Sequence, residues 1–168
     1  MTPTDRVLLI GMMGSGKTTV GHAVADLLGW RYLDNDEQLR RIAGVDTRTL
    51  QERDGVLALR RAESAALSVA LTEAGPLVAG VAAGVVLDPL DLARLRSGGL
   101  VVWLRASLMT LTERVAATDR PWLGDDPAGA LRRLYAGRAD LYRAAAHLVV
   151  DVDTLPPQLV ATRIAAAI

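Results

Sequence analysis

The stretch Gly11-Met12-Met13-Gly14-Ser15-Gly16-Lys17-Thr18 decides the fold of this 168-residue chain. It fits the pattern G-x-x-x-x-G-K-[ST], and it stands between the apolar run 7–10 and a segment with helical spacing of apolar residues. Glycines let successive backbone N–H groups turn toward phosphate oxygens, and a helix N-terminus adds the positive end of its dipole. The stretch therefore predicts a phosphate-binding loop between a first strand and a first helix.

Short aliphatic runs alternate with longer stretches of helical period along the rest of the chain. The predicted strands are 6–10, 31–33, 76–80, 100–104 and 147–151. The predicted helices are 17–28, 36–43, 55–74, 89–96, 107–117, 127–146 and 157–167. Nearly continuous apolar strands are typical of a parallel sheet covered on both faces. We therefore expect an α/β fold, a doubly wound five-stranded parallel sheet flanked by helices, in a single domain over 1–168.

The composition excludes several classes of protein. The chain has no Cys, which removes disulfides and cysteine nucleophiles, and its 19 Lys+Arg balance 19 Asp+Glu. A neutral balance argues against nucleic-acid or membrane-surface binding, and no apolar run reaches the length of about 18 residues that a membrane span needs. We expect a cytoplasmic, monomeric protein that acts on a small molecule.

The single lysine of the chain lies in the predicted loop. Of the 19 cationic residues, 18 are Arg and the other is Lys17. In this motif the lysine reaches the β and γ phosphates, and the hydroxyl of Thr18 can bind Mg²⁺. The alternative interpretation is a glycine-rich turn without a ligand. The predicted strand before the loop and the predicted helix after it argue against this alternative.

Two carboxylates follow the second predicted strand, at Asp34 and Asp36. In a parallel sheet they lie at the same edge as the loop, so one can hold the water shell of Mg²⁺ and the other can orient an acceptor hydroxyl or take its proton. The alternative is that one of them only caps the next helix.

Five stretches, in this order and spacing, resemble the shikimate kinase family. They are 11–21, Tyr32-Leu33-Asp34-Asn35-Asp36, Leu59-Arg60-Arg61-Ala62-Glu63, Arg120-Pro121-Trp122-Leu123 and Arg138-Ala139-Asp140-Leu141-Tyr142. The resemblance implies a P-loop kinase fold, ATP and Mg²⁺ as cofactors, and a hydroxylated carboxylic acid as substrate. It also implies substrate-binding helices over about 34–64 and a short lid over about 118–127.

The resemblance also implies a role for each matching residue. The ATP-binding residues are Gly14, Ser15, Gly16, Lys17, Thr18, Thr19 and Arg120. Thr18 and Asp34 are the metal-binding candidates, and Lys17, Asp36 and Arg120 are the catalytic candidates. The substrate-binding candidates are Asp36, Arg60, Arg138, Ala82 and Ala83. An arginine suits the substrate carboxylate because its planar guanidinium binds a carboxylate through two hydrogen bonds.

The chain departs from the family pattern where the family has three successive glycines. Here the segment 79–86 reads Ala-Gly-Val-Ala-Ala-Gly-Val-Val, so either Gly80 or Gly84 remains from the triplet. Added Cβ atoms narrow a pocket and disfavour positive φ. Leu59 also replaces the aromatic residue that the family has before its arginine, and Trp122 takes an aliphatic position of the lid.

Three functions remain open at this point, whereas for a fourth, a nucleotide kinase, the sequence identifies no base-binding pocket. The first is an ATP-dependent shikimate kinase, for which Asp36, Arg60 and Arg138 argue. The second is a related kinase for another polyol, of the gluconate-kinase or cyclitol-kinase kind. The third is a degenerate module that binds nucleotide without turnover, as the altered glycine segment suggests.

Overall fold

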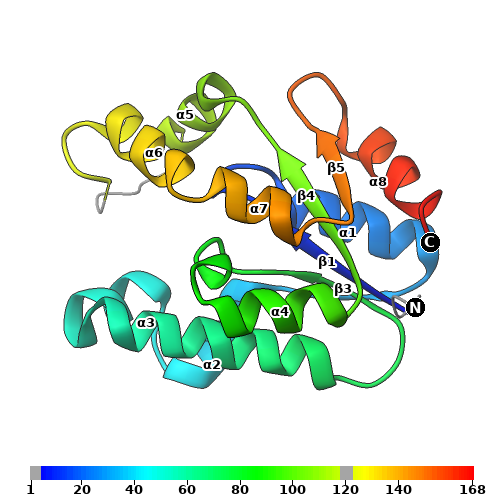
Figure 1. Ribbon diagram of the computed structural model, residues 1–168, viewed down its shortest axis with the longest axis horizontal. Coiled ribbons are helices and arrows are strands. Elements are labelled where there is room, and N and C mark those ends of the chain that lie inside the picture. Colours follow the sequence, from blue (N-terminus) through cyan, green and yellow to red (C-terminus); the bar gives the residue numbers. More distant parts are fainter. Residues whose placement is uncertain (1–4, 118–122) are drawn as a thin grey trace.

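The fold is a parallel sheet of five strands with helices on both faces, in a computed structural model that describes residues 5–117 and 123–168 (Figure 1). The strands are β1 (Arg6–Ile10), β2 (Arg31–Leu33), β3 (Leu77–Gly80), β4 (Leu100–Arg105) and β5 (Leu148–Asp151). Their order in the sheet is β2-β3-β1-β4-β5, and every pair is parallel. The predicted fold class is confirmed.

Helices connect the successive parallel strands. They are α1 (Lys17–Leu28), α2 (Asn35–Ala43), α3 (Thr47–Thr72), α4 (Pro89–Ser97), α5 (Leu108–Ala116), α6 (Pro127–Ala136), α7 (Ala139–Ala145) and α8 (Pro157–Ala165), with a 3₁₀ turn η1 (Val85–Leu87) after β3. Helices α1 and α8 pack together on one side of the sheet, and α4 and α7 lie on the other (Figure 1).

The core explains why the central strands form where the sequence predicts them. Val7, Leu8 and Leu9 of β1 are wholly buried between the neighbouring strands and the two helix layers, as are Val101 and Val102 of β4. A strand covered on both faces has to be apolar at every position, so a short continuous aliphatic run locates it well. Among the described residues, no helix is long and apolar enough to cross a membrane.

A second, smaller apolar cluster joins α2 to α3. It consists of Leu39, Leu50, Leu59, Ala62 and Ala66. The carboxylate of Asp46 accepts from the N–H of Thr49 at 2.8 Å and so begins α3 well before the predicted start at residue 55. Gly55 then kinks the helix with φ 84° and ψ 175°, which is the reason that its first part could be mistaken for a loop.

The prediction of one continuous helix over 127–146 is wrong. Helix α6 ends at Ala136, and α7 begins at Ala139 after a break at Gly137 and Arg138. Arg138 has φ −125° and ψ −21°, outside the helical range, and its side chain is buried at the cleft described below. Glycine has a low helix propensity, so the break costs little here.

Candidate active site

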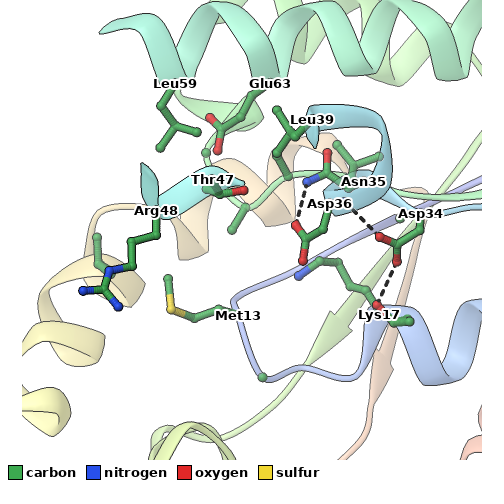
Figure 2. A pocket seen from close by; sticks show the side chains of 18 of the residues that line it. Met13, Lys17, Asp34, Asn35, Asp36, Leu39, Thr47, Arg48, Leu59 and Glu63 are labelled. Carbon is green, nitrogen blue, oxygen red and sulfur yellow. Dashed lines mark hydrogen bonds between the residues drawn. The ribbon is translucent and has the colours of Figure 1, made fainter. Parts of the chain in front are cut away.

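A cleft of about 570 Å³ opens at the carboxyl ends of the strands. The phosphate-binding loop lines one part of it, and segments from α2, α3, α6 and the turn after β3 line the rest (Figure 2). Ligands of doubly wound sheets bind at this edge. The sequence-predicted residues Lys17, Asp34, Asp36, Arg60 and Arg138 all line this one cleft.

The loop has the glycine geometry that a phosphate cradle requires. Gly14 and Gly16 have φ values of 82° and 91°, which side chains rarely adopt, and a Cβ on Gly11 would lie 2.7 Å from the carbonyl oxygen of Leu104. Lys17 Nζ donates to the carbonyls of Gly11 at 2.9 Å and Met12 at 3.0 Å. The lysine ammonium is thereby held over the loop, at the N-terminus of α1.

The other loop residues take different places. Gly14, Gly16, Thr18 and Thr19 line the cleft. Ser15 is 1% exposed, and its hydroxyl has no hydrogen-bond partner within 5–117 and 123–168. A polar atom that is buried without a partner is uncommon in proteins and is consistent with a loop built around a polar ligand.

Arg114 of α5 is a loop contact that the sequence did not indicate. Its guanidinium donates to the carbonyl of Gly14 at 3.1 Å, across 100 residues of sequence. A Cβ on Gly16 would lie 3.6 Å from the same nitrogen. The contact adds a second cation beside the loop, and no local motif marks it.

Asp34 caps the helix that follows it and also contacts the phosphate-binding loop. Its Oδ1 accepts from the N–H groups of Asp36 at 2.9 Å and Glu37 at 3.1 Å, which caps α2. Its Oδ2 accepts from the hydroxyl of Thr18 at 3.2 Å, which places it beside the loop. One carboxylate therefore joins the start of α2 to the start of α1.

The oxygen atoms of Thr18 and Asp34 lie together and are of the kind that Mg²⁺ prefers. Magnesium prefers oxygen ligands and is usually held by one or two side chains together with waters and substrate phosphates. Within the described parts of the chain, no group of three or more His, Cys, Asp or Glu side chains could hold a metal alone. A site completed by nucleotide phosphates is consistent with this arrangement.

Tyr32 contacts Asp34, and the family-like stretch that contains it assigned it no role. Its ring fills a slot between two glycines, because a Cβ on Gly21 would overlap the ring and one on Gly80 would lie 2.7 Å from the hydroxyl. The hydroxyl lies 3.5 Å from Asp34 Oδ2. Burial is the main cause that raises the pKa of Tyr32, so the group stays protonated.

Arg60 and Arg138 flank a buried carboxylate. Arg60 forms an ion pair with Glu63 one helical turn along α3, and Glu63 is 6% exposed. Burial raises the pKa of Glu63, while the positive charges of Arg60 and Arg138 oppose that rise. Arg138 is itself 6% exposed, and its Nε has no partner among the described residues. It is therefore not a solvated surface residue.

The altered glycine segment fits the fold without strain. Val81, Ala82 and Ala83 line the cleft, and within the described chain no residue other than glycine has a positive φ. The two remaining glycines both lie at close contacts. A Cβ on Gly80 would press on Tyr32, and one on Gly84 would overlap the guanidinium of Arg60. The segment that departs from the family's glycine triplet therefore forms part of the cleft wall.

The predicted lid falls only partly within the described chain. Arg120 and the rest of 118–122 lie outside the described residues. Leu123, Ala130, Arg133 and Leu134, which follow that segment, line the cleft.

The fold and the cleft define a P-loop kinase that phosphorylates a small molecule. The family model for shikimate kinase matches residues 13–168. The chain belongs to the shikimate kinase family.

Relatives with this name are similar over most of their length. The shikimate kinase of Oleidesulfovibrio alaskensis is 40% identical over 154 residues, 88% of this chain and 88% of the relative. That of Thioalkalivibrio sulfidiphilus is 39% identical over 155 residues, 91% of this chain and 81% of the relative. The solved structure of shikimate kinase from Acinetobacter baumannii in complex with shikimate has a TM-score of 0.91 at 30% identity and covers 99% of this chain and 93% of that chain.

Proposed function

We propose that this chain transfers the γ-phosphate of ATP to a ring hydroxyl of shikimate. The observation that carries the proposal is the meeting of two sets of groups in one cleft of about 570 Å³. The phosphate-binding loop with Lys17 is one set, and the arginines 60 and 138 beside a buried carboxylate are the other. A nucleotide-binding module has no need of the second set.

On the nucleotide side, the loop 14–19 binds the phosphates through its backbone and through Lys17. Phosphoryl transfer asks mainly for positioning and neutralisation of charge, which the ammonium group and the N-terminus of α1 supply. Mg²⁺, when bound, neutralises charge on the β and γ phosphate oxygens, and Thr18 and Asp34 are the residues that would hold it directly or through water. Arg120 is proposed to act from the lid on the same phosphates.

On the acceptor side, Asp36 orients the reacting hydroxyl and takes its proton as the new bond to phosphorus forms. The guanidinium groups of Arg60 and Arg138 bind the carboxylate of the acceptor. Ala82 and Ala83 border the ring. A lid over 118–127 would exclude water and so favour transfer to the acceptor over hydrolysis of ATP.

Measurement of ADP release by the purified chain with Mg²⁺ and ATP tests this function. We expect release to depend on shikimate and to yield phosphorylated shikimate. Gluconate and a cyclitol serve as comparison acceptors. Turnover with one of these and none with shikimate would overturn the proposal in favour of the polyol-kinase alternative. Nucleotide binding without turnover on any acceptor would favour the degenerate module.

We further propose that the chain acts as a monomeric single domain in the cytoplasm, where ATP is available. The proposal is supported by a cleft to which one chain supplies both the nucleotide side and the acceptor side. Sedimentation of the purified chain tests the monomer, and a dimeric mass would contradict it.

A further inference from the structure

The side chain of Tyr32 on β2 is held against the first turns of α1, at the wall of the cleft. Thr18, Gly21 and His22 share one face of α1, since residues three and four apart lie above one another on a helix. A Cβ on Gly21 would overlap the tyrosine ring, and the ring of His22 packs on it with 4.4 Å between the centroids. The ring of Tyr32 is therefore fixed on the face of α1 that carries Thr18.

Gly80, the last residue of β3, leaves room for the hydroxyl group of this ring. Its φ is not positive, so its backbone does not require glycine. A Cβ at this position would lie 2.7 Å from the Tyr32 hydroxyl oxygen and 3.7 Å from the ring carbon Cζ that bears it, and these are the atoms it would meet among the described residues. Glycine in a strand often marks a close approach by another group. Here that group is the hydroxyl, so Gly80 is matched to a tyrosine and not to a phenylalanine.

The hydroxyl that Gly80 admits reaches the two magnesium-binding candidates. It lies 3.5 Å from Asp34 Oδ2, and it is in hydrogen-bonding contact with Thr18 as well. Thr18 Oγ1 and Asp34 Oδ2 are themselves 3.2 Å apart. The three oxygen atoms form one cluster, in which each hydroxyl has one proton to donate and the carboxylate only accepts.

Both protons of this cluster are directed to the carboxylate when Thr18 holds a cation. A hydroxyl oxygen that binds Mg²⁺ uses a lone pair, so its proton goes to another acceptor, and Asp34 Oδ2 is the neighbouring one. Tyr32 donates to the same oxygen. Loss of a partner that orients a metal-binding group typically costs about 10–100-fold in metal affinity or activity.

We propose that Tyr32 is a positioning residue, whose hydroxyl holds Thr18 and Asp34 in the arrangement that binds Mg²⁺ together with the nucleotide. The inference rests on the proposed function, which assigns this pair to magnesium. It gives a role to a hydroxyl that the phosphate-binding motif does not include, and it explains why β3 ends in a glycine that the backbone does not need.

The variant Tyr32→Phe tests the role, with Tyr135→Phe as the matched control. The readout is the calorimetric Kd for ADP, measured without Mg²⁺ and at a series of Mg²⁺ concentrations. Phenylalanine keeps the ring packing and removes the donor, so we expect the Mg²⁺ concentration that gives half of the gain in ADP affinity to rise about tenfold. The Kd for ADP without Mg²⁺ stays within about twofold of the parent, because the backbone of the loop is unchanged. Tyr135 on α6 does not line the cleft, so its variant changes neither value.

The variant Gly80→Ala displaces the same hydroxyl without removing it. We expect Gly80→Ala alone to raise the Mg²⁺ requirement as Tyr32→Phe does, because its methyl group would lie 2.7 Å from the hydroxyl oxygen. In the double variant the nearest ring atom is the carbon at 3.7 Å, which is an ordinary contact. Gly80→Ala should therefore add less than about twofold to the effect of Tyr32→Phe, as two residues that act through one contact do.

An unchanged Mg²⁺ requirement in Tyr32→Phe would overturn the inference, and so would additive effects of the two substitutions. Equal losses of ADP affinity with and without Mg²⁺ would also overturn it, because a loosened fold does not discriminate between the two conditions. If Tyr32→Phe does not fold, Gly80→Ala decides, and an unchanged Mg²⁺ requirement there contradicts the role. A parent chain whose ADP affinity does not respond to Mg²⁺ would overturn the proposed metal roles of Thr18 and Asp34, and the inference with them.

Discussion

Replacement of Asp34 separates its capping of α2 from its negative charge beside Thr18. Asparagine keeps the cap and loses the charge, whereas alanine loses both. Oδ1 caps α2 through two backbone N–H groups, at 2.9 and 3.1 Å, whereas Oδ2 faces Thr18. Asparagine and aspartate cap helices about equally well, and alanine at such a position costs about 1 kcal/mol. We therefore expect Asp34→Asn to keep the stability of the parent, and Asp34→Ala to lose about 1 kcal/mol, or about 2–4 °C in Tm for a chain of this size.

The two variants are expected to share their effect on magnesium. Both lose the negative charge beside Thr18, and loss of a residue that orients a metal site typically costs about 10–100-fold in metal affinity or activity. The calorimetric affinity for ADP, measured at a series of Mg²⁺ concentrations, reports this effect without turnover. Thermal melts of the same samples measure the cap.

Asp88 provides a control for the cap alone. It caps α4 in the same way, accepting from the N–H groups of Leu90 at 2.8 Å and Asp91 at 3.1 Å, and it does not line the cleft. Asp88→Ala should lower Tm like Asp34→Ala and leave the magnesium dependence unchanged. If Asp34→Asn melts as low as Asp34→Ala, the capping account is refuted, and if it binds Mg²⁺ and ADP like the parent, the metal-side role is refuted.

Three further predictions concern the loop, the glycine slot and a histidine. Lys17→Ala should lower kcat by at least about 10²-fold at unchanged Tm, because charge stabilisation is lost, and a loss of a few-fold only would refute its role. Gly21→Ala should destabilise by about 1–3 kcal/mol because its Cβ overlaps the Tyr32 ring. Thermal melts compare it with Gly137→Ala, whose Cβ would lie at an ordinary contact distance of 3.7 Å from the carbonyl oxygen of Arg133 and whose Tm should not fall. His147 accepts a β4 backbone N–H at 3.0 Å through Nδ1, and burial lowers its pKa. Its folded pKa lies below the unfolded one, so its contribution to stability is present above about pH 6.5 and lost as the pH falls below it; denaturant midpoints that do not fall between pH 7 and pH 5 would contradict this.

The sequence was most informative where one physical requirement acts on consecutive residues. The strand predicted over 6–10 coincides with β1, and that over 31–33 coincides with β2. A buried parallel strand needs an unbroken apolar run, and a phosphate-binding loop needs glycines at fixed spacing. Both requirements are local, so they can be read without knowledge of the fold.

The sequence was least informative where a role depends on a distant partner. Arg114 reaches the loop across 100 residues of sequence. The break between α6 and α7 was missed for the same reason. Helical spacing continues through Gly137, and only the buried cleft explains why Arg138 leaves the helix.

Calorimetric titration of shikimate into the unaltered chain and into Arg138→Ala tests the central claim most directly. Arg132→Ala is the control, because this exposed arginine lies on α6 and does not line the cleft. We predict that the parent and the control bind shikimate with one site, and that Arg138→Ala binds at least about tenfold more weakly because a charge-assisted pair with the carboxylate is lost. Shikimate binding that is unaffected by the loss of Arg138 would contradict the account.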